Sequence, residues 1–237
     1  MTLSAPIYVL KQQAKVLSRQ EGIPLYQALD RIANQEGFSA WSLLSAKAIK
    51  TMSKKPVSAL FAQLHPGELA LLGSRRGQGK TRLSIELAIQ IMRRGGHAAF
   101  FTLDFTPTDV ADCFKALGED LNEFADRFLL DDSDQICADY ILSRLAFAPA
   151  NMLVVVDYLQ LLDQKRENPE LTYQVQQLRS FARQRQLIVL CLSQIKRSYD
   201  PASRPCPEVN DIRLPNPLDL SLFDKLCFLN QDTMQIA

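Results

Sequence analysis

A glycine-rich segment of the chain has the residue types of a phosphate-binding loop. It runs Gly-Ser-Arg-Arg-Gly-Gln-Gly-Lys-Thr over residues 73–81 and contains three of the nine glycines of the chain. Glycines let backbone N–H groups curl around phosphate oxygens, and the N-terminus of a following helix adds positive potential. Lys80 can then reach the β- and γ-phosphates of a nucleotide, while the Thr81 hydroxyl can bind Mg²⁺. The G-x-x-x-x-G-K-[ST] pattern is complete except that Ser74 replaces its first glycine.

The alternative for this segment is a glycine-rich helix entry without a ligand. The complete Gly-Lys-Thr ending, placed after a strand-like run and before a helical one, disfavours that alternative. The residues predicted to bind the nucleotide are Gly73, Ser74, Gly77, Gln78, Gly79, Lys80, Thr81 and Arg82.

Three further polar residues follow apolar, strand-like runs. Asp157 is predicted to bind Mg²⁺ together with Thr81, although an aspartate at a strand end also serves as a helix cap or turn former. Asp104 could orient or deprotonate an attacking water, or form a turn before Pro107. Gln194 is predicted to sense the γ-phosphate, with a plain turn as the alternative. Lys80, Asp104 and Gln194 are therefore the candidate catalytic residues.

Strands that alternate with helices are expected to position these residues. Near-continuous apolar runs predict strands at 69–72, 98–103, 152–162, 187–192 and 225–229, and helical patterns fall at 81–94, 109–117, 135–147 and 172–186. Apolar strands separated by helices indicate an α/β fold with a mostly parallel central sheet buried on both faces. The proline-rich segment 201–217 is predicted to be a long loop without strands.

The first fifty residues predict a separate, small all-α module. Three short helices are expected: one at 7–20, a second that starts after Pro24 and ends before Gly37, and a third that begins after Ser39 and carries Trp41. The expected organisation is a helical module at 1–50, a linker at 51–57 and the α/β domain at 58–237.

Composition excludes several classes of protein. Hydrophobic residues make up 47% and charged residues 22% of the 237 residues, which excludes wholesale disorder. The longest apolar stretches are strand-sized and the N-terminus lacks a signal-peptide pattern, so we expect no membrane partner. The five cysteines form no C-x-x-C pair, which argues against a zinc site and predicts a cytoplasmic protein.

Charge is unevenly distributed although the net charge is only +1. Residues 1–60 carry a charge of +5, residues 104–139 of −9 and residues 165–213 of +4. Such a chain can orient on a polyanion, although solvated helix faces explain most charge blocks of this kind.

Several motifs together resemble the C-terminal motor of the DnaB-type replicative helicases. They are Val-Asp-Tyr-Leu-Gln-Leu at 156–161, Leu-Ser-Gln-Ile-Lys-Arg-Ser at 192–198, Asp-Ile-Arg at 211–213, and the lead-in Leu-His-Pro-Gly-Glu-Leu at 64–69 with its nucleotide loop. The resemblance covers about residues 58–230. It implies a RecA-like P-loop core, ATP and Mg²⁺ as cofactors, and a homo-oligomeric ring, such as a hexamer, around single-stranded DNA. Lys80, Thr81, Asp157 and Gln194 correspond to nucleotide-site positions of that family.

Three departures from the family pattern bear on activity. Asp104 stands where the family has a catalytic Glu, and misplacing a general base by about 1 Å can cost about 100-fold in rate. The family's Arg-Glu-Ser-Gly is replaced by Arg-Leu-Pro-Asn at 213–216. The family also continues into a basic finger for the neighbouring subunit's ATP, whereas this sequence ends at Ala237, so Arg197, Arg204 or Arg213 would have to replace the finger.

The loop at 195–213 is the predicted DNA-binding element. Its basic side chains can neutralise phosphates, and Tyr199 could stack on a base or simply pack. The candidate DNA-binding residues are Lys196, Arg197, Arg204 and Arg213. His65 and His97 lie outside any ligand cluster and are predicted to be structural.

The sequence therefore supports one leading function and two alternatives. The leading function is binding and hydrolysis of Mg-ATP by a helicase-like protein on single-stranded DNA, in replication or a related DNA transaction. The first alternative is a nucleotide-binding adaptor with little or no turnover that binds a partner protein or DNA. The second is a recombinase-like ATPase without unwinding activity. A helicase or primase-type protein is a further expected partner, through the helical module.

Overall fold

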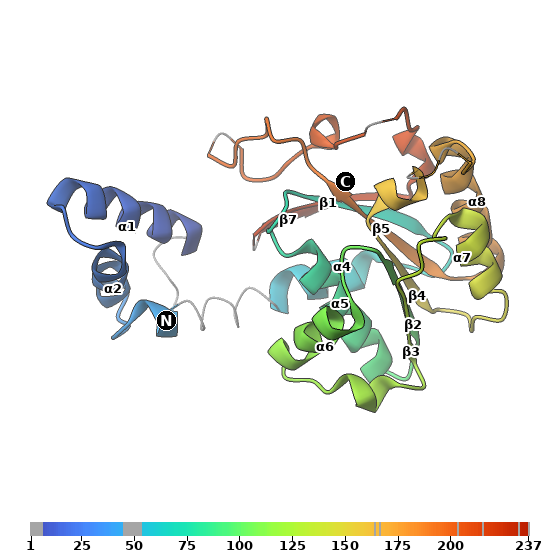
Figure 1. Ribbon diagram of the computed structural model, residues 1–237, viewed down its shortest axis with the longest axis horizontal. Coiled ribbons are helices and arrows are strands. Elements are labelled where there is room, and N and C mark those ends of the chain that lie inside the picture. Colours follow the sequence, from blue (N-terminus) through green and yellow to red (C-terminus); the bar gives the residue numbers. More distant parts are fainter. Residues whose placement is uncertain are drawn as a thin grey trace. The chain divides into compact units, whose positions relative to one another are not determined.

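The computed structural model describes residues 7–44, 54–163, 165, 167–202, 204–214, 216–231 and 233–236 (Figure 1). The chain divides into two compact units, Met1–Lys55 and Pro56–Ala237. Helix α4 (Lys54–Gln63) begins inside the segment 51–57 that was predicted to be a linker. Its residues Val57, Leu60 and Leu64 recur at helical spacing and are buried, so the end of this segment is an amphipathic helix.

The N-terminal unit contains α1 (Ile7–Glu21) and α2 (Leu25–Gln35), as the sequence predicts, and residues 41–44 are helical. Pro24 immediately precedes α2, where its missing N–H leaves no helical hydrogen bond unmade. The Trp41 N–H donates to Asp30 Oδ1 (2.8 Å) and so holds the third helical segment against α2. The remainder of the predicted third helix lies outside the described residues. The buried core consists of Leu10, Ala14, Ala28, Ile32, Ala33 and Leu44.

The second unit is built on one sheet, which has seven strands in the described part of the chain. The strands are β1 (Leu69–Ser74), β2 (Ala98–Thr102), β3 (Phe128–Asp131), β4 (Leu153–Asp157), β5 (Ile188–Gln194), β6 (Lys225–Asn230) and β7 (Thr233–Ile236). Their order is β3-β2-β4-β5-β1-β6-β7, and only β7 runs antiparallel to its neighbour. The predicted mostly parallel sheet is therefore confirmed.

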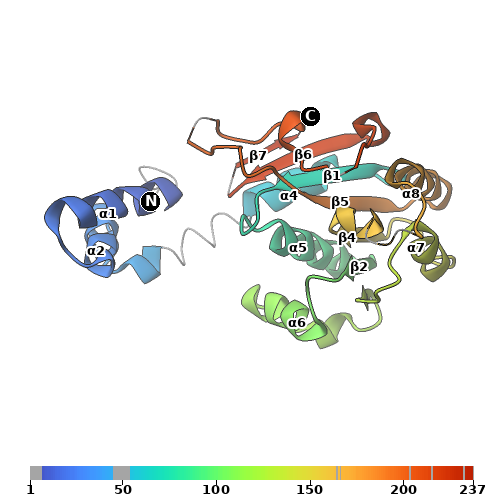
Figure 2. The ribbon, with the colours of Figure 1, turned by 45° about the horizontal axis from the view of Figure 1, so that its top comes forward.

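Helices cover both faces of this sheet (Figures 1 and 2). Helices α4, α5 (Lys80–Arg93) and α6 (Pro107–Ala116) lie on one face, and α7 (Ala138–Arg144) and α8 (Leu171–Arg185) on the other. Short 3₁₀ turns complete the chain; they are η1 (Leu121–Phe124), η2 (Leu159–Asp163), η3 (Val209–Asp211) and η4 (Leu220–Leu222).

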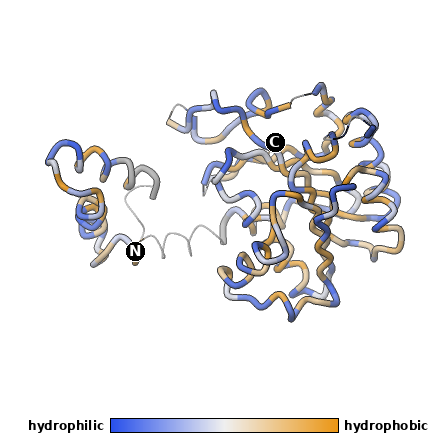
Figure 3. The backbone as a smooth tube through the Cα atoms, in the orientation of Figure 1, coloured by the Kyte–Doolittle hydropathy of each residue, from blue (hydrophilic) through white to orange (hydrophobic). Residues whose placement is uncertain are grey.

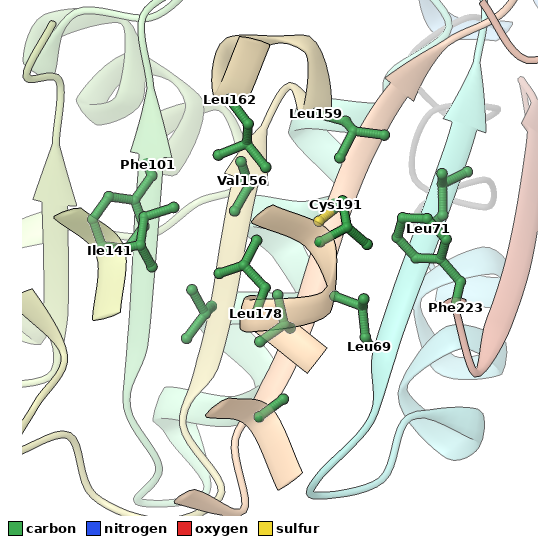
Figure 4. Close-up of a cluster of buried hydrophobic side chains, with 14 of the residues drawn as sticks. Leu69, Leu71, Phe101, Ile141, Val156, Leu159, Leu162, Leu178, Cys191 and Phe223 are labelled. Carbon is green, nitrogen blue, oxygen red and sulfur yellow. The ribbon is translucent and has the colours of Figure 1, made fainter. Parts of the chain in front are cut away.

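Alternation along the strands explains why their sequences are apolar throughout. In β1, Leu69 and Leu71 pack under α8, whereas Ala70 and Leu72 pack under α4 and α5. Because successive side chains of a strand point to opposite faces, a strand covered on both faces needs apolar residues at every position. Figure 4 shows the first of these two clusters, and Figure 3 shows hydrophobic residues concentrated in the central strands.

The structure differs from the sequence predictions in three places. The run 152–162 was predicted as one strand, but β4 ends at Asp157, the Asp157–Tyr158 peptide is cis, and η2 follows. Strands β3 and β7 were not predicted. Helix α7 is shorter than the predicted 135–147.

Candidate nucleotide-binding site

The glycine-rich loop connects the buried end of β1 to the first turn of α5. Gly77 and Gly79 have φ angles of 79° and 88°, in the left-handed region that favours glycine, and Gly79 is the N-cap of α5. A Cβ at either position would meet no atom within 4 Å, so their requirement for glycine is conformational. Lys80 and Thr81 are the first two residues of α5, which places them at the positive end of the helix dipole.

Gly73 and Ser74 lie in β1 itself and are both buried. A Cβ on Gly73 would stand 3.1 Å from Ile195 and 3.2 Å from the Phe228 ring, so this glycine permits close packing between the neighbouring strands. The Ser74 hydroxyl donates to the carbonyl of Arg75 (3.2 Å). The sequence pattern cannot distinguish such packing from contact with phosphate.

The two predicted magnesium ligands are in direct contact. The Thr81 hydroxyl donates to Asp157 Oδ2 over 2.8 Å, and Asp157 is 1% exposed. Burial raises the pKa of Asp157, and the charge of Asp104 adds to this effect. The Thr81 hydrogen bond and the Lys80 ammonium act on this pKa in the opposite direction but do not cancel the rise.

Sheet register brings Asp104 and Lys80 to the same place. Thr102, at the end of β2, pairs with Asp157 at the end of β4, and the Asp104 N–H donates to Thr102 Oγ1 (3.1 Å). The charges of both Lys80 and Asp104 act on the Asp157 carboxylate. The Asp104 side chain is exposed, where a water molecule can reach it.

Gln194 ends β5 next to the glycine-rich loop, since it pairs with Ser74 across the sheet. Its amide oxygen accepts a hydrogen bond from Arg213 Nη1 (3.2 Å). Gln160 reaches the same point by donating to the carbonyl of Arg213 (2.6 Å). Sequence reasoning quoted Gln160 inside a motif but gave it no role, because its partner is distant in the chain.

Two residues of the predicted DNA-binding loop are occupied within it. The Arg204 guanidinium forms ion pairs with Glu208 and Asp211, each at 3.0 Å. Tyr199 is 2% exposed, donates to the Arg204 carbonyl (2.8 Å) and lies beneath its guanidinium. The suggestion that Tyr199 stacks on a base was therefore wrong, because its ring is packed inside the loop.

The other basic residues of this loop are exposed. Lys196 Nζ donates to the carbonyl of Asn210 (2.8 Å), and the side chains of Arg197 and Arg213 face solvent. The loop therefore presents three cations from the segments next to its two ends.

Two other predicted nucleotide-site residues have distinct surroundings. The amide oxygen of Gln78 is buried and has no hydrogen-bond partner among the described residues. Arg82 lies one turn of α5 before Glu86, and burial raises the pKa of Glu86 to about 7 although the charge of Arg82 lowers it. The sequence gave no signal for the shifted pKa of Glu86. His65 is exposed and His97 half-buried.

The arrangement fits a nucleotide with a magnesium ion. A left-handed glycine at a helix N-terminus, followed by Lys80, suits phosphate oxygens. Mg²⁺ prefers oxygen ligands and usually keeps several waters, so one hydroxyl and one carboxylate are a sufficient protein contribution. A cation beside Asp157 would also offset the cost of burying its charge. No group of three or more His, Cys, Asp or Glu side chains that could hold a metal ion occurs in the described part of the chain.

Comparisons with known proteins agree with this geometry. A model of the DnaB-like helicase C-terminal domain family matches residues 114–233, a segment that contains Asp157, Gln194 and Arg213 and starts after the glycine-rich loop. No curated protein matches the sequence. Within the described residues, no helix is long and apolar enough to cross a bilayer.

Two solved structures share the fold. One is a DnaB-like replicative helicase, described with its interactions with primase; it is 15% identical with a TM-score of 0.59, over 98% of this chain and 74% of that one. The other is the ATPase domain of a second protein, which is 18% identical with a TM-score of 0.55, over 78% of this chain and 81% of that one. These similarities confirm the expected RecA-like P-loop fold.

Proposed function

The chain belongs to the DnaB-like helicase C-terminal domain family, and from this premise we propose that it binds and hydrolyses Mg-ATP and acts on single-stranded DNA in replication or a related DNA transaction. The observation that carries the proposal is the hydrogen bond of 2.8 Å between Thr81 and Asp157. It brings a hydroxyl and a carboxylate together beside a phosphate-type loop, although they come from α5 and β4.

Each residue of the site has a role in this proposal. The backbone N–H groups at the start of α5 and the Lys80 ammonium bind the phosphates. Thr81 and Asp157 hold Mg²⁺, which neutralises charge on the phosphate oxygens. Asp104 is exposed close to Asp157 and orients the attacking water, and Gln194 responds to the γ-phosphate from the end of β5.

Single-stranded DNA is proposed to bind at the 195–213 loop. Lys196, Arg197 and Arg213 are exposed there and can contact phosphates, which would give an affinity that falls with salt. Arg204 is ion-paired within the loop, so we now assign it to loop structure instead of DNA contact.

Assembly and partners are part of the same proposal. We propose a homo-oligomeric ring, such as a hexamer, because the family premise favours it. The helical N-terminal unit is proposed to bind a helicase or primase-type protein. The five cysteines are free thiols, which suits a reducing compartment such as the cytoplasm.

Asp104 favours a second candidate function. It is one methylene shorter than the glutamate that the family pattern has there, and its side chain is exposed. A general base displaced by about 1 Å can slow the chemical step by about 100-fold. The alternative is therefore a nucleotide-switched adaptor that binds Mg-ATP and a partner protein or DNA but turns over slowly.

Steady-state ATP hydrolysis with and without single-stranded DNA tests the proposal. Three chains are compared: wild type, Lys80→Ala, and Lys115→Ala as a matched control, since Lys115 is exposed on α6. Wild type and Lys115→Ala should hydrolyse ATP faster when DNA is present. Lys80→Ala should lose turnover by at least about 100-fold, because Lys80 contacts the transferred phosphate.

The other outcomes separate the candidates. Tight Mg-ATP binding without turnover would favour the adaptor. Turnover that DNA does not change would remove the DNA part of the proposal, and DNA-stimulated turnover without strand separation on a forked duplex would favour a recombinase-like ATPase. Lys80→Ala with unchanged ATP affinity would overturn the site itself.

A further inference from the structure

Gln160 lies where the nucleotide site meets the 195–213 loop. It belongs to η2, which follows Asp157 and the end of β4. Its amide nitrogen donates to the Arg213 carbonyl (2.6 Å) and, over 3.4 Å, to the Ser193 hydroxyl. One side chain therefore connects three segments: the turn after β4, the end of β5, and the returning end of the loop.

The partner of Gln160 determines how its amide is oriented. The Arg213 carbonyl oxygen can only accept a hydrogen bond, so the amide nitrogen must face it. The amide oxygen of Gln160 is consequently buried, and it has no hydrogen-bond partner among the described residues. An unpartnered buried oxygen costs free energy. The contact with Arg213 is thus made despite a local penalty, as is common where structure serves function.

The backbone next to Gln160 forms a narrow stem for the loop. The Lys196 N–H donates to the Asp211 carbonyl (2.7 Å), and the Arg213 N–H donates to the Gln194 carbonyl (2.8 Å). Ile195 and Ile212 form an antiparallel bridge between these two bonds. Because the Arg213 guanidinium also holds the Gln194 amide oxygen, the position of this stem determines where the Gln194 side chain lies.

The opposite end of Gln160 is fixed to the nucleotide site. Leu159, Leu161 and Leu162 of η2 are buried, and Figure 4 shows Leu159 and Leu162 packed in the cluster that also contains Val156. These contacts fasten η2 to the end of β4, where Asp157 meets Thr81. A displacement of Asp157 is therefore passed to Gln160 through a short, packed segment.

We propose that Gln160 is a positioning residue that ties the stem of the 195–213 loop to the end of β4, so that the geometry of Gln194 and of the loop follows the state of the Thr81–Asp157 pair. The inference rests on the proposed function, because the state in question is the binding of Mg-ATP. Gln160 acts through Arg213 and Ser193 and is not itself in contact with nucleotide in this proposal.

Amide hydrogen exchange of the full chain tests the proposal, followed over residues 194–213 with and without a non-hydrolysable Mg-ATP analogue. The variants are Gln160→Leu, Gln160→Glu, whose carboxylate has a similar shape but cannot donate, and the control Gln176→Leu at an exposed position of α8. Both Gln160 variants should exchange about fivefold faster at Lys196 and Arg213, the factor expected for the loss of one hydrogen bond. In both, the analogue should no longer change this exchange.

Kinetics provide the readout that a merely structural role would not move. In both Gln160 variants, analogue affinity and the KM for ATP should stay as in wild type, whereas the stimulation of kcat by single-stranded DNA should fall. Gln176→Leu should behave as wild type in every measurement.

The outcomes distinguish this inference from the proposed function. If wild type does not bind the analogue, the proposed function fails, and the coupling through Gln160 fails with it. If wild type binds the analogue and its loop responds, but Gln160→Leu and Gln160→Glu respond equally, only the role of Gln160 is overturned. Weaker analogue affinity in both variants would also overturn it, because it would place Gln160 in the nucleotide site.

Discussion

Asp157 keeps a carboxylate where water cannot reach it, and this has a measurable sign. Its pKa is raised by burial, so the folded chain favours the protonated form more than the unfolded chain does. A group of this kind contributes stability below its unfolded pKa, and the contribution is lost as pH rises through the folded pKa. At pH 7 the ionised Asp157 therefore destabilises the nucleotide-free protein.

Asp157→Asn should separate stability from binding. The amide oxygen can still accept from Thr81, but no buried charge remains, so the melting temperature without nucleotide at pH 7 should equal or exceed that of wild type. Mg-ATP at 100 times its Kd should stabilise wild type by about 2.7 kcal/mol and the variant by much less. Thermal unfolding with and without Mg-ATP measures both effects.

Asp126→Asn is the control, because Asp126 is exposed. It should leave both melting temperatures unchanged. A variant at position 157 that is clearly less stable than wild type without nucleotide, yet keeps the Mg-ATP shift, would contradict the assignment of Asp157 to the metal.

Sequence predicted some residues of the site better than others. Lys80, Thr81 and Asp157 were accessible because each is next to an element whose end could be located from apolar periodicity. The roles of Tyr199 and Gln160 were not accessible, because they depend on partners fixed only when the loop closes on β5.

At the scale of elements, the attachment of β6 to the rest of the sheet depends on one carboxylate. Asp224, just before β6, accepts hydrogen bonds from the Leu69 N–H (2.9 Å) and from Arg179 and Arg183 of α8 (both 3.0 Å). Burial tends to raise the pKa of Asp224, but these donors outweigh it and the pKa lies below its usual value. Asp224 therefore connects β1, β6 and α8.

Asp224→Ala should destabilise the folded chain by about 2 kcal/mol at pH 7, since it leaves the Leu69 N–H and Arg179 without their acceptor. Because the folded pKa is lowered, this contribution is present above the unfolded pKa and is lost as pH falls through the folded one. Urea unfolding should therefore show a difference from wild type that narrows below about pH 4.

The exposed Asp132 provides the comparison for this change. Asp132→Ala should alter the free energy of unfolding by less than about 0.5 kcal/mol. An equal loss in both variants, or a difference that grows in acid, would refute the role of Asp224.

Elements were predictable where apolar residues filled both faces. Strands β1, β2, β4, β5 and β6 all came from such runs, whereas β3 and β7 lie at the sheet edges and are less buried. The apolar residues 159–162 were mistaken for a continuing strand, because a buried 3₁₀ turn needs the same residue types.

At the scale of the whole molecule, each unit has a core of its own. The two clusters of the sheet unit contain only residues from Val57 to Phe228 or Leu229, and the third lies between Leu10 and Leu44. Residues 56–237 alone should therefore fold and bind Mg-ATP within about twofold of the affinity of the full chain.

Calorimetric titration of the fragment and the full chain with Mg-ATP checks this expectation. Far-UV circular dichroism of the fragment serves as the control for folding. A folded fragment that binds at least about tenfold more weakly would mean that the helical unit contributes to the site.

The strand order has a consequence for how the protein is made. Strand β1 lies between β5 and β6 (Figure 2), with Leu69 paired to Val189 and Ala70 to Lys225. During synthesis β1 leaves the ribosome long before either neighbour, and pairings between such distant segments form slowly. The glycine-rich loop is thus translated early but matures late, and until β6 emerges the apolar β1 is a surface for chaperones to protect.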